Sequence, residues 1–435
     1  MVVKKVWLVL MIFSLLAVSS FAIVGAANKN QKVEITFWDE NPGPERTPYL
    51  QELIKRFQAL NPNITVKYVG IPSKSAAEKY NLAIAANETP DCGGCPGSWL
   101  STLLTQKALL PLDPYFKKWS EKDQLGASYI AQVRGNAPDK KLYMLPTTAN
   151  HFTLWYRADR FKAAGLTEPK TWNDFFADAE KLTDKKNNQY GTSIRGGSGS
   201  DTPLLAGIIS YSGLTSFYDK KGKCLINSPA AVTFVEKYAA LYGKYTPESD
   251  ITNSYKEMVA AFDGGVANMI FHNLGSYGEH RAALKEGQYA AAPYPVSITG
   301  KRIYLAGVVN GYSVFKNTKN PEAAWKFVSF LASPDSQRFW NQKIGQIPTH
   351  NALLQEDWVK SAQHISAVGS AFAFKDTIAV SQPEYLPDYK NIRLQVMEPG
   401  FQAVLAGKKT AKQFLDELAA TLEKSRKTYQ ANLKK

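Results

Sequence analysis

An aromatic ring, two carboxylates and an amide follow one another early in the chain, as Trp38, Asp39, Glu40 and Asn41. An indole ring packs against apolar C–H faces, while carboxylate and amide groups bind hydroxyl edges. Together these residue types could bind a polyhydroxylated molecule, so we predict that they contact a ligand. The alternative is that the polar side chains bind the backbone of their own loop.

These four residues come at the end of a predicted strand, residues 33–37, in which apolar and polar residues alternate. A helix follows at residues 50–60, with apolar residues at spacings of three and four, and then a second strand at residues 64–68. Strand, helix and strand make a right-handed βαβ unit. We therefore expect an open α/β lobe with a ligand crevice at the C-terminal ends of its strands.

A longer stretch, residues 142–182, is predicted to form two short strands and a helix. Aromatic and β-branched residues dominate its first part, and a polar bend there would expose Thr147, Thr148 and Asn150. Thr171 begins a capping box with Asp174, and apolar residues then recur at helical spacing.

The residue order of this stretch closely resembles the signature P-T-T-x-N, then L-W-Y-x-x-D-x-F-x-x-A-G-L-x-x-P-x-T-W, of the family 1 extracellular solute-binding proteins. These are the sugar-capturing receptors of ABC importers, related to maltose-binding proteins. The resemblance implies a two-lobed α/β fold of the type II periplasmic binding proteins, each lobe an open sheet flanked by helices, with the ligand cleft between them. It also implies that residues 152–157 form a hinge strand and that Asn150 faces the cleft.

The resemblance spans nearly all of the chain after residue 27 and predicts the division into lobes. The first lobe is expected to comprise residues 28–154 plus 286–330, and the second residues 155–285 plus 331–435. Strands are expected at residues 190–194, 290–296 and 303–315, and a turn at 347–349. The third parallel strand of the family, expected near residue 91, is in doubt because a cysteine and glycine cluster stands there.

Further ligand contacts are predicted outside the first loop, where relatives place contacts or where polar groups follow strands and bends. They are Trp99, Asn150, His151, Arg195, Asp201, Asn273, Gly307 and Arg393. For His151 a structural, hydrogen-bonded histidine is the favoured alternative, and for Trp99 the alternative is core packing. Four other tryptophans lie in periodic patterns and are expected in the core: Trp155, Trp172, Trp325 and Trp340.

Cys92 and Cys95 flank two glycines, which gives the backbone freedom to close a small ring. Because the chain is expected to be exported, we predict a disulfide between them. Free thiols, or a redox or metal site, are the alternatives. The five histidines show no metal-ligand spacing, so neither a metal nor a cofactor is predicted.

Residues 1–27 have the pattern of a cleaved signal peptide: Lys4 and Lys5, an apolar run, and small residues before Asn28. No cysteine precedes Cys92, so a lipid anchor is not expected. The prediction is a periplasmic or secreted protein, and the alternative is an uncleaved membrane anchor. The formal net charge is +14, but the lysines are scattered, which favours a solvated basic surface over a nucleic-acid or other anionic partner.

The predicted function is a receptor, not an enzyme, that captures a mono- or oligosaccharide by lobe closure. It is expected to act as a monomer and to deliver the ligand to an ABC transporter permease. The alternative is a secreted carbohydrate-active enzyme, a glycosidase or lyase that uses a pair of carboxylates in the cleft.

Overall fold

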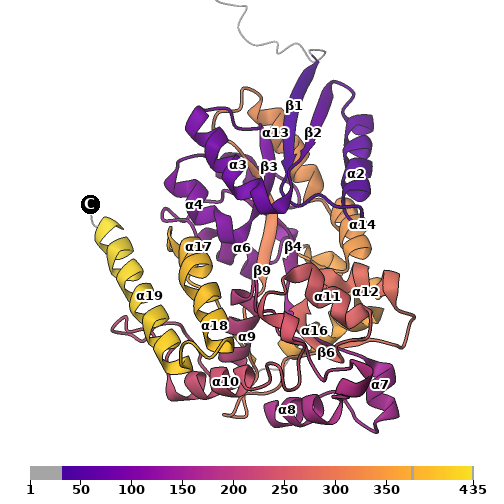
Figure 1. Cartoon of the computed structure of the whole chain (residues 1–435). Coiled ribbons are helices and arrows are strands. Elements are labelled where there is room, and N and C mark those ends of the chain that lie inside the picture. Colours follow the sequence, from indigo (N-terminus) through magenta and orange to yellow (C-terminus); the bar gives the residue numbers. More distant parts are fainter. Residues whose placement is uncertain (1–31, 374–376, 434–435) are drawn as a thin grey trace, which may run out of the picture.

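The computed structural model describes residues 32–373 and 377–433, which form two lobes joined by several chain crossings (Figure 1). The signal peptide predicted at residues 1–27 lies outside the described residues. Among the residues described, no helix is both long and apolar enough to cross a membrane.

The first lobe is built on a six-stranded sheet with the order β10-β4-β9-β3-β1-β2. Its strands are β1 (Val33–Asp39), β2 (Ile64–Gly70), β3 (Cys92–Pro96), β4 (Leu145–Asn150), β9 (Val308–Val314) and β10 (Ile347–Pro348). Strand β1 pairs in parallel with β2 and β3, whereas β9 is antiparallel to β3 and β4. The parallel half is the βαβ unit expected from the sequence.

Helices cover both faces of this sheet (Figure 1). They are α2 (Thr47–Leu60), α3 (Ser73–Ala86), α4 (Leu100–Thr105), α5 (Asp113–Phe116), α6 (Ala127–Gly135), α13 (Pro321–Leu331) and α14 (Pro334–Ile344). Helix α2 buries an apolar stripe that includes Leu53 and Phe57. The ring of Phe57 meets Phe327 of α13 with centroids 5.0 Å apart, and Phe327 in turn meets Phe37 of β1 at 5.3 Å. Helices from distant parts of the sequence thus share one core with β1.

The second lobe has a three-stranded sheet with the order β6-β5-β7 and a separate pair, β11-β8. Its strands are β5 (Phe152–Tyr156), β6 (Met269–Asn273), β7 (Ala290–Ala292), β8 (Ile303–Leu305) and β11 (Ile378–Val380). The strand expected at residues 190–194 forms only isolated bridges, from Tyr190 to Ala267 and from Ser193 to Ile270. The sheet is therefore smaller than the sequence predicted.

Helices make up most of the second lobe. They are α7 (Ala158–Ala163), α8 (Trp172–Lys181), α9 (Asp201–Ser212), α10 (Pro229–Ala239), α11 (Tyr255–Asp263), α12 (Tyr277–Ala283), α15 (Asp357–Ser361), α16 (Gln363–Ala373), α17 (Tyr389–Ile392), α18 (Glu398–Leu405) and α19 (Ala411–Leu433). Helix α8 begins with the predicted capping box: Thr171 accepts from the Asp174 amide, and Asp174 accepts from the Thr171 amide. Its Trp172 lies in the core of the lobe among Phe175, Phe234 and Phe271.

The chain crosses between the two sheets at points that differ from the predicted lobe boundaries. Strand β4 ends at Asn150 in the first sheet and β5 begins at Phe152 in the second, so the crossing is at His151 rather than along a hinge strand. Residues 290–292, expected in the first lobe, pair with β5 of the second. Helix α14 and strand β10, expected in the second lobe, belong to the first.

Residues 347–349, expected as a turn, include the short edge strand β10, which pairs with β4. The strand expected over residues 303–315 is interrupted at Ala306 and Gly307, where the chain crosses back to the first lobe. Gly307 packs against His151, because a Cβ at this glycine would lie 2.5 Å from the imidazole ring. Two crossings are therefore in direct contact.

The disulfide predicted between Cys92 and Cys95 is wrong. Both residues are free and buried, and they lie in strand β3. In an extended strand, residues three apart point to opposite faces and stand about 10 Å apart, too far for a disulfide. The cysteine and glycine cluster is the third parallel strand that the sequence analysis had placed in doubt.

Candidate functional site

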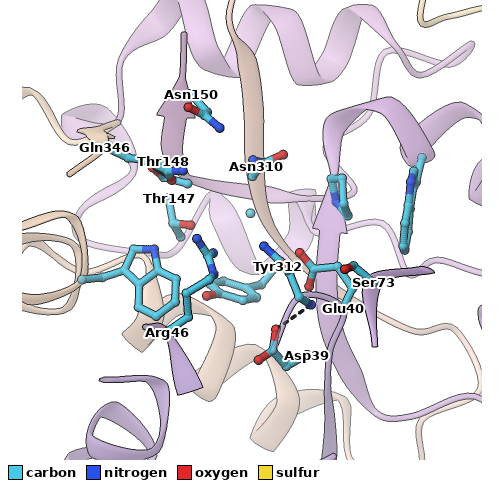
Figure 2. Close-up of a pocket in the computed structure, with 15 residues that line it drawn as sticks. Asp39, Glu40, Arg46, Ser73, Thr147, Thr148, Asn150, Asn310, Tyr312 and Gln346 are labelled. Atoms are coloured by element: carbon cyan, nitrogen blue, oxygen red, sulfur yellow. Dashed lines mark hydrogen bonds between the residues drawn. The ribbon is translucent and has the colours of Figure 1, made fainter. Parts of the chain in front are cut away.

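A cavity of about 290 Å³ opens at the C-terminal ends of β1 and β3 and along β4 and β9. Figure 2 shows its walls, which come from elements of the first lobe and from the residues between them. The lining residues are Asp39, Glu40, Asn41, Arg46, Ser73, Pro96, Trp99, Thr147, Thr148, Asn150, Asn310, Gly311, Tyr312, Trp340 and Gln346. Five of the predicted contacts are among them: Asp39, Glu40, Asn41, Trp99 and Asn150.

The two adjacent carboxylates of the cavity have different surroundings. Asp39 accepts hydrogen bonds from the Tyr68 hydroxyl, at 2.8 Å, and from the Asn41 backbone amide, at 3.0 Å. For Glu40, burial and the neighbouring charge of Asp39 raise the pKa to about 7. Asp39 thus holds the loop in shape, while Glu40 can exchange a proton near neutral pH.

Two glycines of β3 make room for the side chains of Glu40 and Tyr80. A Cβ at Gly94 would lie 1.5 Å from Oε2 of Glu40, so this carboxylate occupies the space that any other residue would fill. A Cβ at Gly93 would lie 2.6 Å from the Tyr80 hydroxyl. That hydroxyl donates to the Gly94 carbonyl at 3.1 Å. The sequence predicted that Gly93 and Gly94 allow a small ring to close. In the structure, their missing side chains leave room for Glu40 and Tyr80 instead.

Aromatic rings stand on several sides of the cavity. The guanidinium of Arg46 lies over the Trp340 ring, 4.8 Å from its centroid, and the ammonium of Lys390 lies 5.0 Å from the centroid of Trp99. Tyr312 packs against Phe37 below it. Trp340 was predicted to be a core residue, and it is indeed buried, but one part of it reaches the cavity.

Two buried amide oxygens in the wall have no hydrogen-bond partner among the described residues: Oδ1 of Asn150 and Oδ1 of Asn310. They come from β4 and β9, which are paired neighbours, and Figure 2 shows both side chains beside the same space. An unpartnered buried acceptor costs free energy that a donor from a ligand would recover. The cavity is therefore prepared to accept hydrogen bonds from hydroxyl groups.

Thr148 and Gln346 close the wall next to Asn150. The Thr148 hydroxyl lies 2.9 Å from Oε1 of Gln346 and 2.7 Å from Oδ1 of Asn341. Asn341 donates to the Thr147 carbonyl, at 3.2 Å. These contacts fix the side chains of β4 against α14 and β10.

Three predicted contacts of the second lobe lie outside the cavity, in a cluster of their own. Arg393 donates to the Asp201 carboxylate and, at 3.0 Å, to the Thr202 hydroxyl. Burial alone would raise the pKa of Asp201, but Arg393 holds that pKa below its usual value. Burial and Asp201 raise the pKa of neighbouring Glu398 to about 7. Arg195 donates to the Ser198 carbonyl at 2.8 Å.

The other predicted contacts are not part of the cavity lining either. Trp38 packs edge-on against Tyr80, with centroids 5.3 Å apart, on the other side of β1. Asn273 accepts a hydrogen bond from the Asn150 side chain at 3.2 Å, one step behind the wall. His151 and Gly307 form the crossing contact described above, and burial lowers the pKa of His151 to about 4.

Sequence reasoning missed Arg46, Ser73, Asn310, Tyr312, Trp340 and Gln346 as cavity residues. The polar bend had pointed to Thr147 and Thr148 without assigning them a role. Asn310 and Tyr312 alternate along β9, so period-two spacing would have placed both on one sheet face. Nothing local to the sequence indicated that β9 lies beside β4.

The chemistry of the cavity is that of a binding site with aromatic surfaces, amide acceptors, a cation and carboxylates. Over residues 32–373 and 377–433, no group of three or more histidine, cysteine, aspartate or glutamate side chains could hold a metal ion.

Comparisons with known proteins agree with this reading of the fold. A sequence profile described as bacterial extracellular solute-binding protein matches residues 43–338 of this chain. The sn-glycerol-3-phosphate-binding periplasmic protein UgpB of Escherichia coli O1:K1 is 24% identical over 436 residues, covering 92% of this chain and 96% of that protein.

Solved structures of similar fold include the GacH receptor of Streptomyces glaucescens, determined unliganded and with acarbose. Its TM-score is 0.78 at 20% identity, over 91% of this chain and 98% of that one. Maltose-bound MalE3 of T. maritima also has a TM-score of 0.78, at 22% identity, over 90% of this chain and 99% of that one. The likeness establishes the two-lobed fold.

Proposed function

Because this chain belongs to the bacterial extracellular solute-binding protein family, we propose that its cavity captures a saccharide or a related polyol and that the lobes close over it. The observation that carries the proposal is the pair of unpartnered acceptors, Asn150 Oδ1 and Asn310 Oδ1, set among aromatic rings. Ring faces of a sugar pack on indoles while its hydroxyls donate to amide oxygens. The similar structures that contain acarbose or maltose, and the relative named for binding glycerol 3-phosphate, support this ligand class.

We place the ligand first on the first lobe, because all fifteen lining residues belong to its elements or to those packed with them. The second lobe then covers the ligand. Arg195, Asp201 and Arg393, which the sequence predicted as contacts, are proposed to form the covering wall rather than the primary site, while Asn273 lies behind Asn150. Contacts from both lobes would make the closed state the better binder and so shift the population toward it.

The receptor role extends to its location and partner. The predicted signal peptide at residues 1–27 would direct the chain out of the cytoplasm. Outside the cytoplasm, the protein acts as a monomer and delivers its ligand to an ABC transporter permease. The family description as extracellular supports export.

A thermal-shift panel of hexoses, pentoses, disaccharides, alditols and glycerol phosphate tests the binding role. A ligand at one hundred times its dissociation constant adds about 2.7 kcal/mol to stability, a shift that is easily measured. If no member of the panel moves the melting temperature, the proposed ligand class is wrong.

The alternative function, a glycosidase or lyase, would need a pair of carboxylates in the cavity. Burial raises the pKa of Glu40, as for a general acid, but its neighbour Asp39 already accepts hydrogen bonds from Tyr68 and Asn41. A glycosidase needs two carboxylates that flank the scissile bond. We therefore expect no product when the protein is incubated with oligosaccharides and the mixture is chromatographed.

A further inference from the structure

Asn150 is a cavity residue of the first lobe that is bonded directly to the second lobe. Its Nδ2 donates to Oδ1 of Asn273 at 3.2 Å, while its own Oδ1 lies buried without a partner among the described residues. Asn150 ends β4, and Asn273 ends β6, where it stands opposite Phe152. The bond therefore lies beside the crossing at His151.

The acceptor on Asn273 is itself fixed. Its Oδ1 also accepts from the backbone amide of Gly275, at 2.9 Å, and so caps the short helical turn Leu274–Ser276. An acceptor held by two donors presents a defined position to Asn150. Because Nδ2 is thereby engaged, the opposite side of the Asn150 amide, Oδ1, is held in one orientation.

Gln346 completes the arrangement from the first lobe. Its Oε1 lies 2.9 Å from the Thr148 hydroxyl, and its Nε2 lies against Gly275. A Cβ at Gly275 would stand 2.8 Å from Gln346 Nε2, 2.8 Å from Asn273 Oδ1 and 3.7 Å from Asn150 Nδ2. Three amides from both lobes thus converge on the one residue that has no side chain.

We propose that Asn273, Gly275 and Gln346 are positioning residues, which hold the Asn150 amide with Oδ1 toward the ligand and so couple ligand binding to the angle between the lobes. The inference rests on the proposed binding function. None of Asn273, Gly275 and the Gln346 amide nitrogen has to touch the ligand for this role. A rotation of the second lobe that moved Asn273 would release the Asn150 amide.

Gly275→Ala tests the coupling at a residue that does not itself line the cavity. Its methyl group displaces the flexible ends of Asn273 and Gln346, which the fold tolerates. Gly278→Ala is the matched control, because nothing lies within 4 Å of a Cβ there. With the best ligand of the panel, Gly275→Ala should weaken binding about tenfold, as the loss of a buried hydrogen bond does, whereas Gly278→Ala should stay within about twofold of the wild type.

A second pair of variants separates positioning from mere packing. Asn273→Ala removes the acceptor and should weaken binding as Gly275→Ala does. Asn273→Asp keeps an oxygen that accepts from Asn150 and Gly275, and should restore affinity to within about threefold of the wild type.

The lobe angle is measured in the same proteins, with and without ligand, by the distance between spin labels at Lys55→Cys and Lys162→Cys. Both lysines are exposed, and the three native cysteines are buried, so labelling is selective. Gly275→Ala should broaden or shift the distance distribution even without ligand, and Gly278→Ala should not.

Unchanged affinity and an unchanged distribution in Gly275→Ala would overturn the coupling. A wild-type protein that binds nothing in the panel would instead overturn the proposed function. The unliganded distances then still test the contact between the lobes: a shift confined to Gly275→Ala and Asn273→Ala shows that this contact sets the lobe angle, and no shift contradicts it.

Discussion

In the first lobe, the unpartnered acceptors Asn150 Oδ1 and Asn310 Oδ1 belong to residues that line the cavity, whereas the predicted contacts Asp201 and Arg393 of the second lobe form a buried ion pair outside it, in which Asp201 keeps one oxygen without a partner among the described residues. Asn150 and Asn310 each leave a buried amide oxygen without a partner among the described residues. Arg393, by contrast, is bonded to Asp201 and Thr202. Polar residue types alone do not identify a binding site; unmet hydrogen-bonding capacity in the wall of a cavity does.

The largest expected effect is a loss of stability when the buried ion pair of the second lobe is broken. Arg393→Met leaves the Asp201 carboxylate, only 1% exposed, without its cation. Removal of one partner of a buried ion pair costs about 3–5 kcal/mol, so urea unfolding should show a loss of that order. Lys412→Met is the control, since its pair with Asp416 lies on the surface and should cost about 0.5 kcal/mol or less.

If Arg393→Met kept its stability but lost all ligand binding, the cluster would be a primary site and the comparison would fail.

A somewhat smaller effect is expected on binding, in the first lobe. Gly94→Ala pushes the Glu40 carboxylate out of the space that the glycine leaves and into the cavity, because the new Cβ would overlap Oε2. A charged hydrogen-bonding group that is displaced from its position no longer makes its bonds to the ligand, which costs about 2 kcal/mol, or roughly thirtyfold in affinity. Titration calorimetry measures this. Gly135→Ala, where nothing lies within 4 Å of a Cβ, controls for the added methyl group. Normal affinity in Gly94→Ala would show that Glu40 does not contact the ligand.

The two tryptophans predicted as stacking platforms should now behave differently. Trp99 lines the cavity, whereas Trp38 packs on Tyr80 outside it. Trp99→Ala should weaken binding about tenfold, or about 1.4 kcal/mol, and Trp38→Ala by less than about twofold. Intrinsic-fluorescence titrations of both variants check this. Equal losses would mean that the ligand reaches beyond the described cavity.

The smallest expected effect concerns pH. Burial raises the pKa values of Glu40 and, in the second lobe, Asp250 to about 7 each. A carboxyl with a raised pKa binds more protons in the folded state, so the unfolding free energy falls as pH rises from the unfolded pKa, about 4.5 for glutamate, to about 7. Glu40→Gln and Asp250→Asn should each reduce that fall, by at most about 1.4 kcal/mol for each pH unit.

Only Glu40→Gln should also alter the pH dependence of ligand affinity, since Asp250 is bonded to Ser193 and Ile194 away from the cavity. If Asp250→Asn also altered the pH dependence of ligand affinity, the binding site would not be confined to the first lobe.

Local patterns in the sequence predicted the elements that depend on neighbours in the chain. The apolar spacing in residues 50–60 and the capping box at Thr171 both correspond to real helices. The strand predicted at residues 33–37 is part of β1, which continues to Asp39, and Asp39, Glu40 and Asn41 line the cavity at its end.

Contacts between distant segments were beyond such patterns. Cys92 and Cys95 have the spacing of a small ring, but pairing with β9, more than 200 residues later, holds them in an extended strand. Trp340 follows a core-like helical pattern, and only the position of α14 beside Arg46 brings it to the cavity. Likewise, which residues of the second lobe bind one another was not readable from their types.

A crystal structure of the wild-type protein with the ligand found by the thermal-shift panel tests the central claim most directly. The account predicts a sugar or polyol in the first-lobe cavity, with hydroxyls donating to Oδ1 of Asn150 and Oδ1 of Asn310 and a ring face against Trp99 or Trp340. A ligand held by Arg195 and Arg393, with both of those amide oxygens still unpartnered, would contradict it.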